Sequence, residues 1–366
     1  MIYKTLALVC LITFLSAGCN ENVIVVTKPP ISKPEVVPTE TIMPSQMSEQ
    51  PTVQSKNSRP LQFVVLSFDG SYSLPMWEDT LNFSQEMRIA GVPVRFTYFL
   101  SGVYFLNYRK AHRYHPPLKP VGTSLIGFAD SNLDVERRVA YVNRAIAEGH
   151  EIGSHSNGHF SGAKWSKKSW EQEFSEFNNL LFSIDENNDV DTIDAERYRL
   201  HISPEEIVGY RAPELAKNSA MYEVLKKFNF AYDTSGTGKP EVWPQKRADG
   251  LWEFPLALIP YADTNSLILS MDYNFYYKQS KAKDVTKKGD ELWNDFFEKT
   301  YSSYLNYFTS NYKGTRAPVY IGSHFSTWND GVYWEAMKQF TKDVCDKPDV
   351  RCGSFRELMN YLNSQK

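Results

Sequence analysis

The sequence predicts an α/β protein built around a mostly parallel β-sheet, arranged either as a barrel or as an open doubly wound fold. Short apolar, β-rich runs alternate along the chain with longer segments in which apolar residues recur at helical spacing. The first run, at 62–68, is apolar without alternation, which is typical of a strand buried on both faces. We find no internal repeat, so the alternation indicates one α/β unit and not a repeat array.

The expected elements follow one another from residue 61 towards the C-terminus. Strands are predicted at 62–68, 94–100, 150–155, 207–211, 230–233, 251–259, 267–273 and 318–324. Helices are predicted at 77–91, 134–148, around 170–181, at 290–311 and at 331–344. Glycines close two of these helices, at Gly91 and Gly149, as expected of helix C-termini.

The composition is that of an ordinary globular protein and argues against a nucleic-acid partner. The 366 residues are 42% hydrophobic and 23% charged, with a net charge of −3 and therefore no basic excess. Aromatic residues make up 14% of the chain. Their faces suit sugar rings, but core packing explains them more simply.

The N-terminus predicts a bacterial lipoprotein. Lys4 precedes an apolar run that is long enough for a secretory signal and short for a membrane span. The run ends in "LSAGC", which resembles a lipobox, so we expect a signal peptide over 1–18 and a lipid on Cys19. Asn20, and not aspartate, follows and favours the outer membrane, with the protein facing the periplasm or the cell surface. Ordinary signal cleavage after a small residue is the alternative.

Residues 19–60 predict a tether, and the cysteines predict one disulfide. Six prolines between Pro29 and Pro51, mixed with Ser, Thr and Gln, suit an extended segment and not a packed unit. Cys10 leaves with the signal and Cys19 takes the lipid. Cys345 and Cys352 remain in a compartment where disulfides persist, and their spacing argues against redox catalysis.

Reactive side chains follow directly after several expected strands, where core residues would be out of place. They are Asp69, His155 with His159 four positions on, Arg211 and His324. The histidine pair alone is a weak signal, because this spacing also arises by chance. Parallel α/β folds, however, gather their chemistry at the carboxyl ends of the strands, so we expect these residues to converge.

These residue types suit metal-assisted hydrolysis of an amide or an ester. Two imidazoles can hold a first-row divalent metal, which polarises a carbonyl group and lowers the pKa of bound water. A carboxylate can then act as general base, and a separate imidazole can protonate a departing amine or alcohol.

The ordered segments "SFDG", "HSNGH", "RAPE", "YDTS" and "GSH" resemble the five motifs of the polysaccharide deacetylases, carbohydrate esterase family 4. The resemblance covers nearly all of 61–366, and the segment from 322 onward is similar to the chitin-deacetylase branch, including its paired cysteines. It implies that 61–366 is a single catalytic domain, folded as a distorted (β/α) barrel with fewer than eight full repeats.

The resemblance also implies a role for each residue at the strand ends. Asp69 matches the general base, His324 the general acid and Arg211 the arginine that holds the base in place. His155 and His159 match metal ligands, with Zn²⁺ as the expected metal and Co²⁺ as the alternative. The implied substrate is an acetylated glycan containing N-acetylglucosamine, such as peptidoglycan or a chitin-type oligosaccharide.

One departure from the family pattern concerns the metal. The family usually has a second aspartate after the base, as third metal ligand, and here Gly70 takes that position. Asp69 could itself become the third ligand, with Asp79, Glu214 or Asp272 acting as base instead. The metal could also keep two histidines and extra waters, or the site could be inactive. The retention of all the other motif residues favours an active site.

Other residues receive weaker predictions. Trp328 and Trp252 could line the sugar cleft or belong to the core. Asp233 could orient a partner or form a turn, and the remaining histidines receive no role. The leading hypothesis is a metal-dependent polysaccharide N-deacetylase. A non-catalytic glycan-binding envelope lipoprotein and an O-acetyl esterase are the alternatives.

Overall fold

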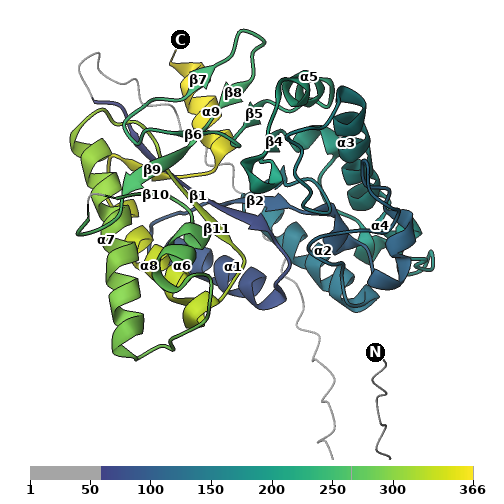
Figure 1. Ribbon diagram of the computed structural model, residues 1–366, viewed down its shortest axis with the longest axis horizontal. Coiled ribbons are helices and arrows are strands. Elements are labelled where there is room, and N and C mark those ends of the chain that lie inside the picture. Colours follow the sequence, from purple (N-terminus) through teal and green to yellow (C-terminus); the bar gives the residue numbers. More distant parts are fainter. Residues whose placement is uncertain (1–58, 265, 366) are drawn as a thin grey trace, which may run out of the picture. The chain divides into compact units, whose positions relative to one another are not determined.

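The computed structural model describes residues 59–264 and 266–365 (Figure 1). The predicted signal peptide over 1–18, the lipid site at Cys19 and all but the last two residues of the predicted tether lie outside the described residues. Within the described part of the chain, none of the helices is both long enough and apolar enough to cross a membrane.

A nine-stranded sheet forms the centre of the fold, with the order β11-β1-β2-β3-β4-β5-β8-β7 and with β12 pairing beside β1. Every neighbouring pair is parallel except β7 with β8. In chain order, the strands are β1 (Gln62–Gly70), β2 (Thr97–Leu100), β3 (Glu151–Ser154), β4 (Gly209–Tyr210), β5 (Tyr232–Asp233), β7 (Gln245–Lys246), β8 (Trp252–Glu253), β11 (Val319–His324) and β12 (Val350–Cys352).

A smaller sheet of three strands continues the main sheet beyond β11. It has the order β10-β9-β6, formed by β6 (Thr237–Gly238), β9 (Leu256–Pro260) and β10 (Leu267–Leu269). A parallel bridge between Met271 and Gly322 joins the end of this sheet to β11. The result is a distorted (β/α) barrel in a single domain, and the predicted fold class is confirmed.

Helices separate β1 to β5 from one another and also lie between β10, β11 and β12, whereas β5 to β10 follow one another without a helix; the helices lie around the sheet (Figure 1). They are α1 (Leu74–Ile89), α2 (Asn132–Ala147), α3 (Lys167–Phe182), α4 (Ile184–Asn187), α5 (Ser219–Lys227), α6 (Asp272–Ser280), α7 (Glu291–Lys313), α8 (Trp328–Cys345) and α9 (Phe355–Ser364). The first three begin after Ser73, Ser131 and Ser166, and each of these side chains accepts a hydrogen bond from the N–H three residues on. Serine at this position satisfies a backbone donor that the helix itself leaves unpaired.

Alternate residues of β1 face two different environments. Val64, Leu66 and Phe68 pack in the core beneath the helices. Phe63 and Val65 pack in a second cluster inside the barrel, together with aromatic rings from β2, β8 and β11 and with Phe355 of α9. Because strand side chains alternate between faces, Ser67 and Asp69 share the inner face with Phe63 and Val65. The barrel interior therefore changes from apolar to polar towards the carboxyl end of β1.

The predicted elements are largely present, with two corrections. The single strand predicted over 251–259 is two strands in different sheets, β8 and β9, separated around Pro255. Proline lacks the N–H that a continuous ladder would need at this position. The strand predicted over 267–273 ends at Leu269, and Asp272 begins α6. This second correction moves Asp272 from a sheet to the start of a helix.

The predicted disulfide is present and joins the end of α8 to β12. Cys345 and Cys352 are bonded, with their Cα atoms 5.7 Å apart. The disulfide links α8 to β12, and β12 pairs with the beginning of β1.

Candidate active site

The register of the parallel strands brings the predicted site residues to one end of the barrel. Asp69 is paired in register with His324 of β11. Ser154, the last residue of β3, is paired with Tyr210 of β4, so that His155 and Arg211 follow at the same level. Carboxyl ends of neighbouring parallel strands lie along one edge, which is why residues far apart in sequence meet here.

A single pocket of about 510 Å³ contains most of these residues. Its lining is Asp69, His155, His159, Ala212, Glu214, Leu215, Leu269, Met271, Tyr273, Asn274, His324 and Trp328. The structure thus brings together the predicted base, histidine pair and general acid. Arg211 lies beneath the pocket, fully buried inside the barrel.

Asp69 and Arg211 form a buried ion pair. The Nη1 group of Arg211 donates to Asp69 Oδ1 over 2.7 Å. The same guanidinium donates to Ser67 and Thr234 and lies over the ring of Phe99, 4.5 Å from its centroid. Burial opposes ionisation of Asp69, but Arg211, and then the nearby histidines, hold the pKa of this carboxyl below its usual range. Asp69 is therefore ionised and fixed in orientation at neutral pH.

His155 and His159 lie side by side, with their ring centroids 5.3 Å apart. The Nδ1 of His155 is 2.8 Å from the backbone carbonyl oxygen of Arg211. A carbonyl oxygen can only accept, so Nδ1 carries the proton and Nε2 keeps a free lone pair. Burial lowers the pKa of His155 to about 4, and burial with the nearby His324 also lowers that of His159. Both rings are therefore neutral at pH 7.

The histidine pair fits two ligands of a divalent metal. Metal-binding histidines are neutral and commonly donate their other ring N–H to a carbonyl or carboxylate, as His155 does. Across residues 59–264 and 266–365, however, no group of three or more His, Cys, Asp or Glu is arranged to hold a metal ion. Asp69 does not complete a three-ligand set with the pair, and its Oδ1 is engaged by Arg211.

His324 is oriented by Asp272, an interaction that the sequence reasoning missed. The Nδ1 of His324 lies 2.7 Å from Asp272 Oδ1, and the backbone N–H of His324 donates to Oδ2 over 2.8 Å. Burial by itself would lower the pKa of His324, but the charge and hydrogen bond of Asp272 raise it above its ordinary value. A histidine kept protonated in this way suits a general acid.

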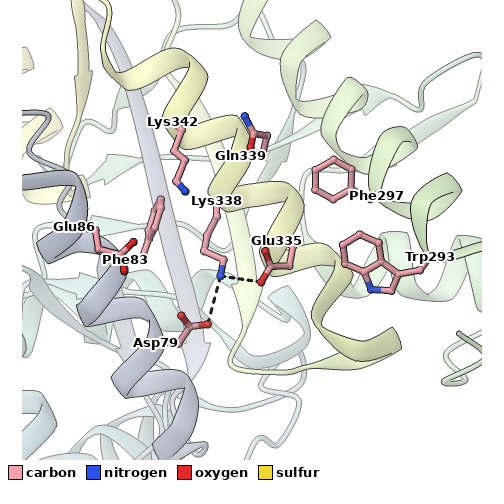
Figure 2. Close-up of a pocket in the computed structure, with 9 residues that line it drawn as sticks. All are labelled: Asp79, Phe83, Glu86, Trp293, Phe297, Glu335, Lys338, Gln339 and Lys342. Carbon is pink, nitrogen blue, oxygen red and sulfur yellow. Dashed lines mark ion pairs between the residues drawn. The ribbon is translucent and has the colours of Figure 1, made fainter. Parts of the chain in front are cut away.

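The alternative bases that the sequence suggested lie in three different places. Asp79 is not in the active-site pocket. It lines a separate pocket of about 350 Å³ between α1, α7 and α8. Figure 2 shows Asp79 and Glu335 facing Lys338 there. Asp272 is engaged by His324, whereas Glu214 lines the active-site pocket and is exposed. Of the three, only Glu214 offers a carboxylate to the pocket besides Asp69.

The two tryptophans differ in position. Trp328 lines the pocket and stacks on Tyr276, with ring centroids 4.7 Å apart. Trp252 belongs to the cluster inside the barrel, where its ring stacks on Phe254, so of the two places that the sequence allowed for it, the core is the one it occupies. An aromatic residue in a strand with buried neighbours is ordinary core, and no local signal separated the two.

Asp233 has a structural role. Its Oδ1 accepts from the backbone N–H of Ser235, which is the turn that the sequence allowed for. The hydroxyl of Ser235 in turn accepts from the N–H of Ala212, directly after Arg211. Asp233 therefore steadies the loop next to the ion pair without facing the pocket.

Gly70 adopts a backbone conformation that favours glycine. Its φ is +86°, in the left-handed region, and a Cβ there would meet only a ring carbon of Tyr104 at 3.7 Å. Space for a side chain is thus available, but any L-residue would be strained. The backbone alone is a sufficient reason for glycine at the position where the family usually has its third ligand.

No protein-family model and no curated protein sequence matches the chain. Among solved structures, it is similar to a proposed polysaccharide deacetylase from Mycobacterium smegmatis. The TM-score is 0.52 at 15% identity, over 85% of this chain and 93% of the other. The chain has the polysaccharide-deacetylase fold. At 15% identity this similarity establishes the fold alone, and the activity has to be inferred from the chemistry of the site.

Two further structures with the deacetylase fold align less well. One is the carbohydrate esterase domain of a multidomain xylanase from the hindgut metagenome of Trinervitermes trinervoides, with 14% identity, 83% and 92% of the two chains covered, and a TM-score of 0.41. The other is peptidoglycan deacetylase PdaC from Bacillus subtilis, with 11% identity, 83% and 93% covered, and a TM-score of 0.41. At these scores they add nothing to the assignment of the deacetylase fold.

Proposed function

We propose that the protein is a metal-dependent hydrolase that removes acetyl groups from a glycan containing N-acetylglucosamine, such as peptidoglycan or a chitin-type oligosaccharide. One observation carries the proposal. An ionised carboxylate, a neutral histidine pair and a histidine of raised pKa line the same pocket of a deacetylase fold. Titratable groups whose environments push their pKa values apart are typical of acid–base catalysis.

Each side chain has a distinct task in this reaction. Asp69, held by Arg211, takes the proton from the attacking water. His324 holds a proton, supported by Asp272, and donates it to the nitrogen that leaves when the amide bond breaks. His155 and His159 would hold the divalent cation, which when bound polarises the acetyl carbonyl.

The pocket lining supports a sugar substrate. The apolar side chains of Leu215, Leu269 and Met271 also line the pocket and suit an acetyl methyl group. Trp328 and Tyr273 add aromatic surface near His324, 5.6 and 6.1 Å from it between ring centroids. Aromatic rings bury large apolar area while tolerating polar neighbours, as the faces of a sugar ring require.

An acetate-release assay on the full chain tests the proposal. We expect release from N-acetylglucosamine oligomers or peptidoglycan strands with Zn²⁺ or Co²⁺ present. We also expect a loss of at least about tenfold in His155→Ala, since even the residues that orient metal ligands contribute about 10–100-fold. Equal rates for parent and variant, or no release with any divalent metal, would end the proposal. His201→Ala is the matched control, because His201 is exposed and outside the pocket.

Two alternatives remain distinct in the same assay. The lack of a three-ligand metal group among the described residues favours a non-catalytic glycan-binding protein, for which glycan binding would persist in His324→Ala without any acetate release. An O-acetyl esterase would act on acetylated xylan in preference to N-acetyl sugars. An alcohol needs less protonation than an amine, so His324→Ala would then lower the rate comparatively little.

The pH dependence reports the role of Asp272. His324 is active as an acid only when protonated, so the rate should fall as pH rises through its pKa. Because Asp272 raises that pKa, Asp272→Asn should move the alkaline limb of kcat/KM to lower pH. The pH–rate profile of acetate release measures this limb. Glu335→Gln, which removes a carboxylate from the separate pocket that Asp79 lines, is the control and should not move the alkaline limb. An alkaline limb that does not move in Asp272→Asn would contradict the role of Asp272 in raising the pKa of His324.

We further propose that the enzyme acts at the bacterial cell envelope, attached through a lipid on Cys19. The lipobox-like segment and the proline-rich sequence after it support this location. Cys19→Ser should then release the protein from the membrane fraction without changing its activity towards soluble oligomers.

A further inference from the structure

The loop that carries the histidine pair has an unfavourable backbone conformation. Ser156 and His159 have φ values of +58° and +59°, in the left-handed region that side chains other than those of glycine rarely adopt. Two such residues within five positions cost free energy, and they persist only where neighbouring groups fix them. The question is which groups hold this loop in place.

A buried carboxylate on α3 bonds directly to the loop. Oε1 of Glu173 accepts from the backbone N–H of Asn157 over 2.9 Å. The backbone carbonyl of Glu173 accepts from Nδ2 of Asn157, also over 2.9 Å. The side chain and the backbone carbonyl of Glu173 therefore both bind Asn157, which lies midway between His155 and His159.

A tyrosine hydroxyl links this carboxylate to the next loop residue. The hydroxyl of Tyr114 accepts from the backbone N–H of Gly158 over 3.2 Å and donates to Glu173 Oε2 over 3.1 Å. The contact is close, since a Cβ on Gly158 would come within 3.0 Å of the Tyr114 ring. Consecutive N–H groups of the loop thus bond to one connected pair of side chains.

The setting of Glu173 is not that of an ordinary helix residue. It is fully buried on the face of α3 that also carries Trp170, Phe174 and Phe177. None of the described residues forms an ion pair with it, and its side-chain donors are the loop and Tyr114. Burial raises the pKa of Glu173 to about 7, although these donors oppose the rise. A buried carboxylate is unfavourable without such bonds, so its presence here requires a reason other than packing.

We propose that Glu173 and Tyr114 are positioning residues, which hold the loop between His155 and His159 in its strained conformation and thereby set the spacing of the two imidazoles. The catalytic consequence of this arrangement rests on the proposed function. Its structural consequence concerns the loop alone and can be measured without metal or substrate.

Hydrogen–deuterium exchange of the peptide covering 155–160, in the metal-free full chain, tests the structural consequence. Tyr114→Phe removes one hydroxyl and should speed exchange in this peptide about tenfold, as expected for the loss of a buried hydrogen bond. Tyr98→Phe is the matched control, because its buried hydroxyl donates to Thr80 of α1 and not to the loop. Unchanged exchange in Tyr114→Phe, or an equal rise in the control, would overturn the proposal.

Substitutions of Glu173 separate positioning from general packing. Glu173→Gln keeps an acceptor for the Asn157 N–H and should exchange within about twofold of the parent, whereas Glu173→Leu should match or exceed Tyr114→Phe. Leucine suits the apolar face but leaves the Asn157 N–H and the Tyr114 hydroxyl without their acceptor, so the midpoint of urea unfolding should fall by the cost of these unpaired donors while the faster exchange stays confined to the peptide covering 155–160. A midpoint that falls in step with faster exchange throughout the chain would indicate mere packing and contradict the proposal.

The catalytic consequence has its own readout. In Glu173→Leu, Co²⁺ should bind at least tenfold more weakly than in Glu173→Gln, measured by calorimetry, and kcat should fall with KM little changed. A parent that binds no metal and releases no acetate would refute the proposed function, while the exchange data would still decide whether the loop is held. Equal Co²⁺ affinity in the two variants would refute the link between the loop and the histidine spacing.

Discussion

Replacing Asp69 by asparagine is expected to lower kcat/KM for acetate release by about 10²–10⁴-fold, the usual contribution of a general base. Asparagine has nearly the same shape but cannot take a proton from water. The pKa of Asp69 lies below its usual range despite burial, because of Arg211 and the nearby histidines, so the parent keeps the basic form throughout the neutral range. Steady-state kinetics at pH 7 measure the loss.

Metal content in the same variant separates base from ligand. Since Oδ1 of Asp69 is engaged by Arg211 and the described residues include no metal-binding group of three, Asp69→Asn should bind as much metal as the parent. A fall in metal content together with activity would instead identify Asp69 as a ligand. Ser67→Ala, which removes a neighbouring hydrogen bond to Arg211 but no charge, is the control and should stay within about tenfold of the parent.

The sequence predicted the position of the site because two simple regularities held. Apolar runs such as 62–68 are strands, and the residue types that follow them are unsuited to a core. In a parallel sheet those residues must share one edge, so Asp69, His155 and His324 converge whatever the details of the helices. Predictions that depend only on strand order and direction could therefore be made without coordinates.

Predictions that depend on the residue at which a strand ends could not be made from the sequence. Asp272 lies within the segment 267–273 that the sequence predicts as a strand, but the strand ends at Leu269 and a helix starts at Asp272, whose carboxylate contacts His324. Trp252 was similarly ambiguous, because the sequence of a short strand does not show whether its aromatic residue belongs to the core or lines the sugar cleft. In both cases the decisive information is tertiary.

Gly70 shows a limit of another kind. In the sequence it is a missing metal ligand, and that absence suggests a weakened or altered site. In the structure it is a residue with φ of +86°, followed by Ser71 with φ of +72°. The backbone conformation at the end of β1 favours glycine whether or not a metal binds. The spacing of apolar residues in the sequence contains no information about this φ angle.

Replacing Arg211 by methionine is expected to lower the free energy of unfolding by about 3–5 kcal/mol, the range for breaking a buried ion pair from one side. Methionine fills similar volume, so the loss comes from charge and not from a cavity. Asp69 would be left buried without its cation, and Ser67 and Thr234 would each lose a donor. Urea unfolding at pH 7 measures the change.

The double variant Asp69→Asn/Arg211→Met shows where this loss originates. Without the carboxylate, no buried charge is left unpaired, so the double variant should be more stable than Arg211→Met alone. The pH dependence should agree. Because the folded-state pKa of Asp69 is depressed in the parent, the pair adds stability above the unfolded-state pKa, and that stability is lost as pH falls through the folded-state pKa. The deficit of Arg211→Met should accordingly shrink in acid. A deficit that is constant with pH, and unrelieved in the double variant, would mean that Arg211 stabilises the barrel through its packing over Phe99 and not by holding Asp69.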